Sequence, residues 1–184
     1  MKKMKKFEEK TLAEEKIFTG RVISLYHQKV ELPNGNTSTR EIVKHPGAVA
    51  VIPITNEGKI VFVEQYRKAL ERSLLEIPAG KLEKGEEPLV TAKRELEEET
   101  GYEAANWEHI QSFYTSPGFA DEYIHIYVAK GLKKLENSAA LDEDEFVEIF
   151  ELTLDECIEE LKKGSIHDAK TCFAVQYLQL LQQN

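Results

Sequence analysis

The chain has 184 residues, with 33 acidic and 24 basic side chains and a formal net charge of −9 at pH 7. This length suits one domain with a sizeable core, or a domain with a small appendage. The negative charge argues against a polymeric nucleic acid as partner, because binding a phosphate backbone requires a basic face. No apolar run approaches the length of a membrane span, and no apolar segment follows the N-terminal lysines. We therefore expect a cytoplasmic protein without a membrane partner.

The first half of the chain predicts strands joined by short turns. Apolar and β-branched runs bounded by Pro, Gly and Asn predict strands over residues 17–32 (one strand or two), 37–44, 48–54, 59–67 and 73–77. The Pro-Asn-Gly-Asn sequence of residues 33–36 suits a hairpin turn. We expect an N-terminal β-hairpin module over residues 1–45 and a larger domain over residues 46–184.

The second half alternates strands and helices. Strands are predicted over residues 107–115, 123–130 and 146–152, and helices over residues 88–100, 155–163 and 168–181. Residues 132–144 read as an acidic loop. This order of mixed strands with helices on the faces predicts an α/β (mixed α+β) sandwich.

The stretch over residues 80–102, GKLEKGEEPLVTAKRELEEETGY, carries the strongest chemical signal. A proline that suits a first helical turn and a glycine that suits a helix end bracket residues 88–100. On that helix Glu95, Glu98 and Glu99 project from one flank, where like charges repel and a cation would remove the penalty. Carboxylate oxygens are the ligands that magnesium and manganese select. Composition alone would favour the alternative, a charged helical face turned to solvent.

The full pattern of this stretch decides against a solvated face. It resembles the Nudix box, which has a glycine, a spaced glutamate, an Arg-Glu pair, a Glu-Glu pair and a closing glycine followed by an apolar residue. Every defining position is matched here, by Gly80, Glu86, Arg94, Glu95, Glu98, Glu99, Gly101 and Tyr102. Tyr102 is aromatic where an aliphatic residue is commoner in the family.

The resemblance implies a fold, a reaction and a metal site. The Nudix fold is an α/β/α sandwich, and Nudix proteins hydrolyse nucleoside diphosphates linked to another group, usually with Mg²⁺, for which Mn²⁺ or another divalent ion can substitute. By this resemblance Glu95, Glu99 and the carbonyl of Ala79 bind metal, while Glu98 supports the metal shell or binds a further ion. Glu86 and Arg94 would form a charge pair that braces the loop before the helix. The resemblance therefore assigns Arg94 primarily a structural role.

A general base is still required, because carboxylates saturated by metal are poor proton acceptors. The acidic run LDEDEF of residues 141–146 precedes a predicted strand, and in relatives a glutamate from this place closes over the substrate. We assign Glu143 as base and Glu145 as metal ligand, and the reverse assignment stays open. The alternative for this run is a solvated acidic loop.

Three features resemble the ADP-ribose pyrophosphatase branch of the family. Pro117 follows the box glycine at the distance where that branch carries a marker proline, and residues 63–80 resemble its lead into the box. The N-terminal module matches an extra domain that the family exchanges between subunits of a homodimer. The resemblance places substrate contacts at Arg21, Arg40 and Arg67, and around the terminal ribose at Ser116, Pro117, Gly118 and Glu122.

The leading hypothesis is therefore Mg²⁺-dependent hydrolysis of ADP-ribose to AMP and ribose 5-phosphate. An alternative within the family is another small-molecule substrate, such as GDP-mannose or a damaged nucleoside triphosphate. A different class, a nucleotide-sensing regulator, is disfavoured because all box carboxylates are present and nothing resembles a helix-turn-helix. The number of metal ions, the phosphorus that is attacked, the substrate range and the oligomeric state are not determined by the sequence.

Overall fold

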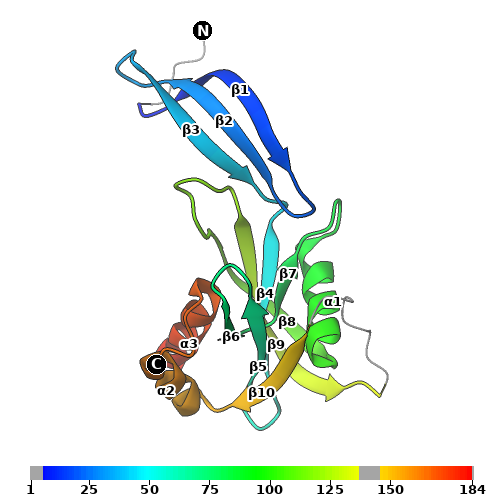
Figure 1. Ribbon diagram of the computed structural model, residues 1–184. Helices are drawn as coiled ribbons and strands as arrows, with labels where there is room; N and C mark the ends of the chain where they lie inside the picture. The colour runs from blue at the N-terminus through cyan, green and yellow to red at the C-terminus, as the bar shows by residue number, and fades with distance from the viewer. Residues whose placement is uncertain (1–5, 137–145, 184) are drawn as a thin grey trace. The chain divides into compact units, whose positions relative to one another are not determined.

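The computed structural model describes residues 6–136 and 146–183. The chain divides into two compact units, one of residues 1–47 with 114–123 and the other of residues 48–113 with 124–184 (Figure 1). The first unit contains the N-terminal strands and one loop of the later chain. The second unit contains the large sheet and the helices.

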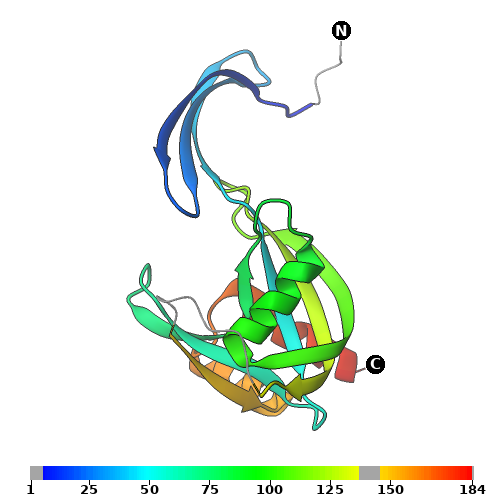
Figure 2. The same ribbon diagram turned by 90° about the vertical axis from the view of Figure 1, so that its right-hand side faces the viewer.

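The first unit is built on a three-stranded antiparallel sheet in the order β1-β2-β3. Its strands are β1 (Lys10–Thr19), β2 (Ser24–Glu31) and β3 (Thr37–Lys44). Figure 2 shows this sheet strongly curved, which agrees with two register shifts in β1, between Thr11 and Ala13 and between Lys16 and Phe18, since bulges bend a strand. The sequence predicted a hairpin here, and the structure adds a strand that begins at Lys10.

The loop of residues 114–123 docks on the end of β3 within this unit. The backbone N–H of Val43 donates to the carbonyl of Phe119 at 2.8 Å, and the N–H of Asp121 donates to the carbonyl of Val43 at 3.2 Å. The Lys44 ammonium lies 2.8 Å from the Asp121 carboxylate. The Ser-Pro-Gly loop is therefore anchored by backbone bonds on the N-terminal sheet.

The second unit contains a seven-stranded mixed sheet in the order β10-β5-β4-β9-β8, with β6 paired to β5 and β7 to β4. Its strands are β4 (Ala48–Ile54), β5 (Ile60–Arg67), β6 (Arg72–Glu76), β7 (Ala79–Lys81), β8 (Tyr102–Tyr114), β9 (Tyr123–Lys134) and β10 (Val147–Leu152). Strand β4 pairs in parallel with β9 and antiparallel with β5 and β7. Because β4 is central, its side chains are buried on both faces, which explains its continuous apolar run.

Helices cover both faces of this sheet (Figure 2). Helix α1 (Pro88–Thr100) buries Ala92 and Leu96 with alternate residues of β4, such as Val49. Helices α2 (Leu154–Lys163) and α3 (Ala169–Gln182) pack on the opposite face with the other set of β4 residues. The mixed α/β sandwich expected from the sequence is confirmed. In the described part of the chain no helix has the length and hydrophobicity to cross a membrane.

In the second unit, three elements depart from the sequence prediction by more than two residues. Strand β7 lies in a segment for which no strand was predicted, β8 begins at Tyr102 with only Gly101 between it and α1, and β9 continues to Lys134 inside the predicted acidic loop. Strand β7 has three residues, and all three pair with β4. Such a strand depends on its distant partner, because so short a segment has no periodicity of its own.

Candidate active site

The ends of α1 follow from local sequence. Pro88 occupies the first helical turn, where its missing N–H costs no hydrogen bond. Gly101 closes the helix with φ 68°, and its N–H donates to the carbonyl of Glu97 at 2.8 Å. Only glycine adopts this left-handed conformation without strain. The helix is therefore set in length and register, and its acidic residues in the last two turns are placed with it.

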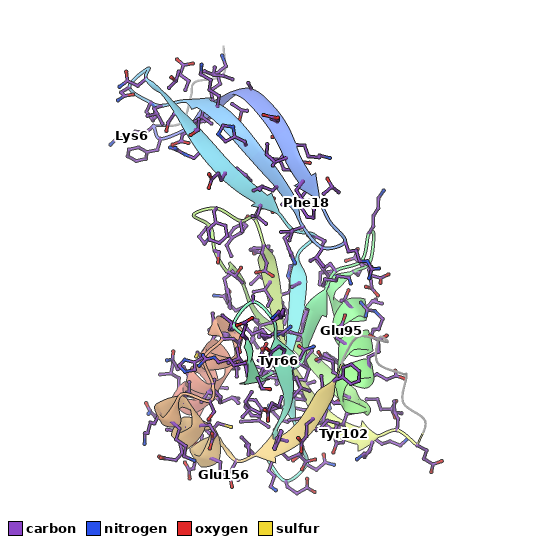
Figure 3. All side chains as sticks on the ribbon, in the orientation of Figure 1. Lys6, Phe18, Tyr66, Glu95, Tyr102 and Glu156 are labelled. Atoms are coloured by element: carbon purple, nitrogen blue, oxygen red, sulfur yellow. The ribbon has the colours of Figure 1, made fainter. Side chains whose placement is uncertain are left out.

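Glu95 and Glu99 lie on the buried side of α1, against β7. Their exposed fractions are 8% and 4%, and Figure 3 marks Glu95 on the helix. A Cβ built on Gly80 would lie 2.0 Å from the Glu95 carboxyl carbon, so the glycine allows the carboxyl group to rest on the backbone of β7. The Ala79 N–H donates to Oε2 of Glu99 at 2.9 Å. Two carboxylates of the helix thus meet the same three-residue strand.

Arg94 places a cation beside three of the acidic side chains, Glu86, Glu95 and Glu98. Its Nη1 lies 2.8 Å from Glu95 Oε1 and 2.8 Å from Glu98 Oε2. Its Nη2 lies 3.2 Å from Glu86 Oε2, so the predicted Glu86–Arg94 pair is present. Burial opposes the charge of Arg94, but the bond to Glu86 and the neighbouring carboxylates raise its pKa above the ordinary value. In turn Arg94, and then Thr91, lower the pKa of Glu86.

The donor chemistry of this face fits a divalent metal ion. Glu95, Glu98 and Glu99 carry carboxylate oxygens, which hard cations such as Mg²⁺ prefer, and the carboxyl group of Glu95 lies against the backbone of Gly80. Within residues 6–136 and 146–183 no three acidic, histidine or cysteine groups converge as a metal cluster. A metal held here by Glu95 or Glu98 would compete with Arg94 for the same oxygens. Glu143 and Glu145 lie outside the described residues.

Arg67 stands at the end of β5 and is held by Glu76 of β6. Its Nε lies 2.7 Å from Oε1 of Glu76 and its Nη2 2.8 Å from Oε2, which is a bidentate pair. The bonds to Glu76 raise the pKa of Arg67 despite burial, and the charge of Glu99 adds to this effect. Of the three arginines predicted to contact substrate, the structure therefore brings Arg67 within the electrostatic influence of the acidic helix.

The other predicted substrate residues belong to the first unit. Arg40 on β3 makes a bidentate pair with Glu9, at 2.9 Å from Nε and 2.5 Å from Nη2. Its Nη1 donates to Ser38 and to the carbonyl of Thr39, so its guanidinium is engaged within the N-terminal sheet. Arg21 is exposed in the connection between β1 and β2.

The predicted ribose-binding loop is stabilised from within. The carbonyl of Ser116 accepts from the N–H groups of Phe119 and Ala120, at 3.1 and 2.9 Å. Pro117 and Gly118 are exposed at its tip. The hydroxyl of Thr115 donates to Glu122, and Nε2 of His45 lies 3.7 Å from the same carboxylate. Ser116, Pro117, Gly118 and Glu122 therefore lie together in one loop, as adjacency in sequence requires.

Sequence reasoning missed a charged network behind Arg67. Glu76 is 2% exposed and also bonds the Lys170 ammonium of α3. One signal was available, because Leu74 and Glu76 share the same face of a strand and Leu74 is clearly a core residue. A glutamate at an inward strand position needs a buried partner. Nothing in the sequence identified Lys170 as that partner.

Comparisons with known proteins concern the family and the fold. A family model described as NUDIX domain matches residues 44–172. The chain is 69% identical over 176 residues to the methanol dehydrogenase activator of Bacillus methanolicus, covering 96% of this chain and 95% of that one. It is 61% identical over 177 residues to the ADP-ribose pyrophosphatase of Bacillus subtilis strain 168, covering 96% of each. A crystal structure of an ADP compounds hydrolase superposes with a TM-score of 0.85 at 20% identity, over 98% of this chain and 97% of that one, which supports the fold.

Proposed function

The chain belongs to the Nudix hydrolase family, and from this membership we propose that it hydrolyses ADP-ribose to AMP and ribose 5-phosphate with Mg²⁺. The observation that carries the proposal is the placement of two buried box carboxylates, Glu95 and Glu99, against the backbone of β7. The full-length relative named ADP-ribose pyrophosphatase supports the choice of substrate.

Glu95, Glu98, Glu99 and the Ala79 carbonyl would hold the metal, with Glu145 as a further ligand. Bound divalent ions polarise phosphoryl oxygens, neutralise developing charge and lower the pKa of an attacking water. Arg94 stabilises the carboxylate cluster before metal arrives, because it pairs with both Glu95 and Glu98. Glu143 is proposed as the base that takes the proton of the attacking water.

Arg67 is the substrate contact with the strongest structural support. A guanidinium has five N–H groups in one plane, and Glu76 uses one on Nε and one on Nη2. Donors on Nη1 and Nη2 can therefore still bind two oxygens of a diphosphate. Arg21, Arg40 and the loop from Ser116 to Glu122 are proposed to contact the adenosine and the terminal ribose.

We propose a homodimer in which the N-terminal module is exchanged between subunits. The N-terminal sheet exposes large apolar side chains that a monomer has no reason to keep in water. Among them are Leu12, Ile17 and Phe18, of which Phe18 is marked in Figure 3. We expect Phe18→Asp to shift the full-length chain from dimer to monomer in sedimentation velocity. A wild-type chain that sediments as a monomer at micromolar concentration would contradict the dimer.

A matched substrate panel tests the proposed reaction. ADP-ribose, GDP-mannose, NADH, a diadenosine polyphosphate and an oxidised guanine nucleotide are incubated at equal concentration, with Mg²⁺ and with chelator. We expect metal-dependent release of AMP that strongly favours ADP-ribose. If another compound is hydrolysed faster, the metal site stands and the substrate assignment is wrong. If no compound is hydrolysed with any divalent ion, a nucleotide-sensing regulator becomes the better account.

The relative named methanol dehydrogenase activator supports a second candidate function, activation of a dehydrogenase. The two chains are 69% identical over 176 residues, which is 96% of this chain. The test is a methanol dehydrogenase assay with the wild-type chain and with Glu99→Gln. Activation by the wild type alone would assign the effect to the hydrolytic site. Equal activation by both proteins would assign it to a surface contact, and no activation would exclude this candidate.

A further inference from the structure

A buried network of alternating charges connects β5, β6 and α3 in the second unit. Glu76 is 2% exposed and receives two cations, the Arg67 guanidinium and the Lys170 ammonium. The Lys170 ammonium lies between Glu76 and Asp168, whose Oδ1 is 2.9 Å away. Each buried charge thus faces an opposite charge, which is the condition for keeping ions out of water.

Asp168 fixes the lysine end of this network to the start of α3. Its Oδ1 accepts the backbone N–H groups of Lys170 and Thr171, at 3.1 and 3.3 Å, and so caps the helix. Its Oδ2 is buried and has no hydrogen-bond partner among the described residues. An aspartate held in this way has little freedom to move. The position of Lys170 therefore follows from the helix start and does not depend on a flexible surface chain.

The backbone beyond Glu76 is tied to two helices. The Ile77 N–H donates to Oγ1 of Thr171 in α3 at 2.9 Å. The Ala79 N–H donates to Oε2 of Glu99 in α1 at 2.9 Å. Between them the Pro78 carbonyl accepts from Val51 of β4 at 2.8 Å. The segment from Glu76 to Ala79 consequently joins the start of α3 to the carboxylate of the acidic helix.

We infer that Glu76 and Lys170 are positioning residues for the diphosphate, which they do not touch, and this inference rests on the proposed function. Glu76 holds the Nε–Nη2 edge of the Arg67 guanidinium through two parallel bonds, so the plane of the fork is fixed before substrate arrives. Lys170 gives the Glu76 carboxylate a second positive partner, so that Arg67 is not drawn wholly inward. The Arg67 side chain stays 40% exposed. The remaining guanidinium donors are thus presented to the substrate.

A purely structural role makes a different prediction. If the network only stabilises the fold, its loss lowers the melting temperature and leaves the Michaelis constant of folded enzyme unchanged. If it orients Arg67, its loss raises the Michaelis constant, and the effect disappears once the arginine fork has itself been removed.

The experiment is a double-mutant cycle on kcat and KM for ADP-ribose at saturating Mg²⁺. The variants are Glu76→Gln, Arg67→Lys, the double variant and Lys170→Met. Lysine keeps the charge at position 67 and loses the fork. Lys163→Met is the matched control, because Lys163 pairs with Glu160 at 2.7 Å on the exposed face of α2. Melting temperatures by circular dichroism identify the variants that are folded at the assay temperature.

We expect Glu76→Gln to raise KM by about tenfold, the size of one lost charge-assisted bond. The double variant should have the KM of Arg67→Lys alone, Lys170→Met should raise KM in the same direction, and Lys163→Met should match wild type. An unchanged KM in folded Glu76→Gln, or losses that multiply in the double variant, would overturn the inference. Should Glu76→Gln fail to fold, an unchanged KM in Lys170→Met overturns it.

The proposed function and the positioning role of Glu76 and Lys170 can be refuted separately. If wild type does not hydrolyse ADP-ribose, the proposed function is wrong. The positioning role is then read from equilibrium binding of ADP-ribose in chelator, where no turnover occurs. Equal dissociation constants for wild type and Lys170→Met in that titration would overturn the inference as well.

Discussion

Gly80→Ala tests whether the carboxylate of Glu95 must rest against β7. A Cβ at this position would lie 2.0 Å from both Cδ and Oε1 of Glu95 and 2.4 Å from Oε2. Non-bonded heavy atoms prefer a separation of about 3.5 Å or more, so the carboxyl group must retreat by about 1.5 Å. The clashing atoms are the far end of a flexible side chain, and an off-rotamer torsion costs only about 0.5–1.5 kcal/mol. The variant should therefore fold.

The same displacement of the Glu95 carboxyl group should strongly lower the activity. A displacement of about 1 Å in a group that positions reacting atoms can lower the rate by about 100-fold. We expect Gly80→Ala to lose about that factor in the rate of AMP release from ADP-ribose at saturating Mg²⁺, with a small change in melting temperature. Lys81→Ala is the control, because Lys81 is the exposed neighbour on the same strand. A folded Gly80→Ala enzyme with near-normal turnover would refute the claim that this contact places the metal-binding carboxylate.

Three further predictions concern other parts of the second unit. Glu99→Gln should keep the fold and lose turnover by orders of magnitude, and its weakened binding of Mn²⁺ should be visible by electron paramagnetic resonance; normal affinity would remove Glu99 from the metal site. Burial acts to raise the pKa of Glu76, but the bonds from Arg67 and the charge of Lys170 hold this pKa below its ordinary value of 4.5. The ionised carboxylate therefore stabilises the fold above pH 4.5, and this stabilisation is lost as pH falls through the lower pKa of the folded state. Urea denaturation from pH 7 to pH 3 should thus show wild type and Glu76→Gln converging in unfolding free energy at the acidic end, and a gap independent of pH would contradict the lowered pKa. Thr153→Ala removes the hydroxyl that accepts the Glu156 N–H at the start of α2, while the backbone N–H of residue 153 can still donate to the Glu156 carboxylate. This loss should cost about 1 kcal/mol of unfolding free energy, whereas an unchanged urea midpoint would show that the hydroxyl cap contributes nothing.

Helix α1 was predictable because its signals are local. The bounds expected from the sequence, residues 88–100, are those of the structure. A proline marks the start of the helix and a glycine marks its end, and both signals act on adjacent residues. Helical spacing alone places Glu95, Glu98 and Glu99 on one flank. The strand and helix pattern of residues 46–184 likewise identified the fold class. These features depend on neighbours in sequence, which a single chain displays directly.

The N-terminal sheet was predicted incompletely for a physical reason. Every residue of β1 is exposed, so this strand has no buried face and no apolar alternation to reveal it. Only its end, from Ile17, carries β-branched and aromatic residues that suggested a strand. Strand β1 exists by pairing with β2 over most of its length. A strand defined by its partner is not visible in its own composition.

The charged network was hidden for a related reason. Lys170 and Glu76 are 94 residues apart, and their contact exists only because α3 packs beside the end of β6. Arg94 shows the same limit at short range: sequence assigned it to Glu86, but its bonds to Glu95 and Glu98 follow from the side-chain conformations. Helical spacing therefore predicted which carboxylates share one flank of α1, whereas side-chain conformation and tertiary packing determined which cations pair with Glu95, Glu98 and Glu76.

The most direct test of the central claim is a quantified time course of ADP-ribose hydrolysis by the wild-type chain. AMP and ribose 5-phosphate are measured by chromatography, in Mg²⁺ and in excess chelator. The account predicts equal amounts of the two products, formed with Mg²⁺ and abolished by chelator. Undiminished hydrolysis in chelator would contradict the assignment of the acidic helix as a divalent-metal hydrolytic site, and intact ADP-ribose in the presence of Mg²⁺ and Mn²⁺ would contradict ADP-ribose as the substrate.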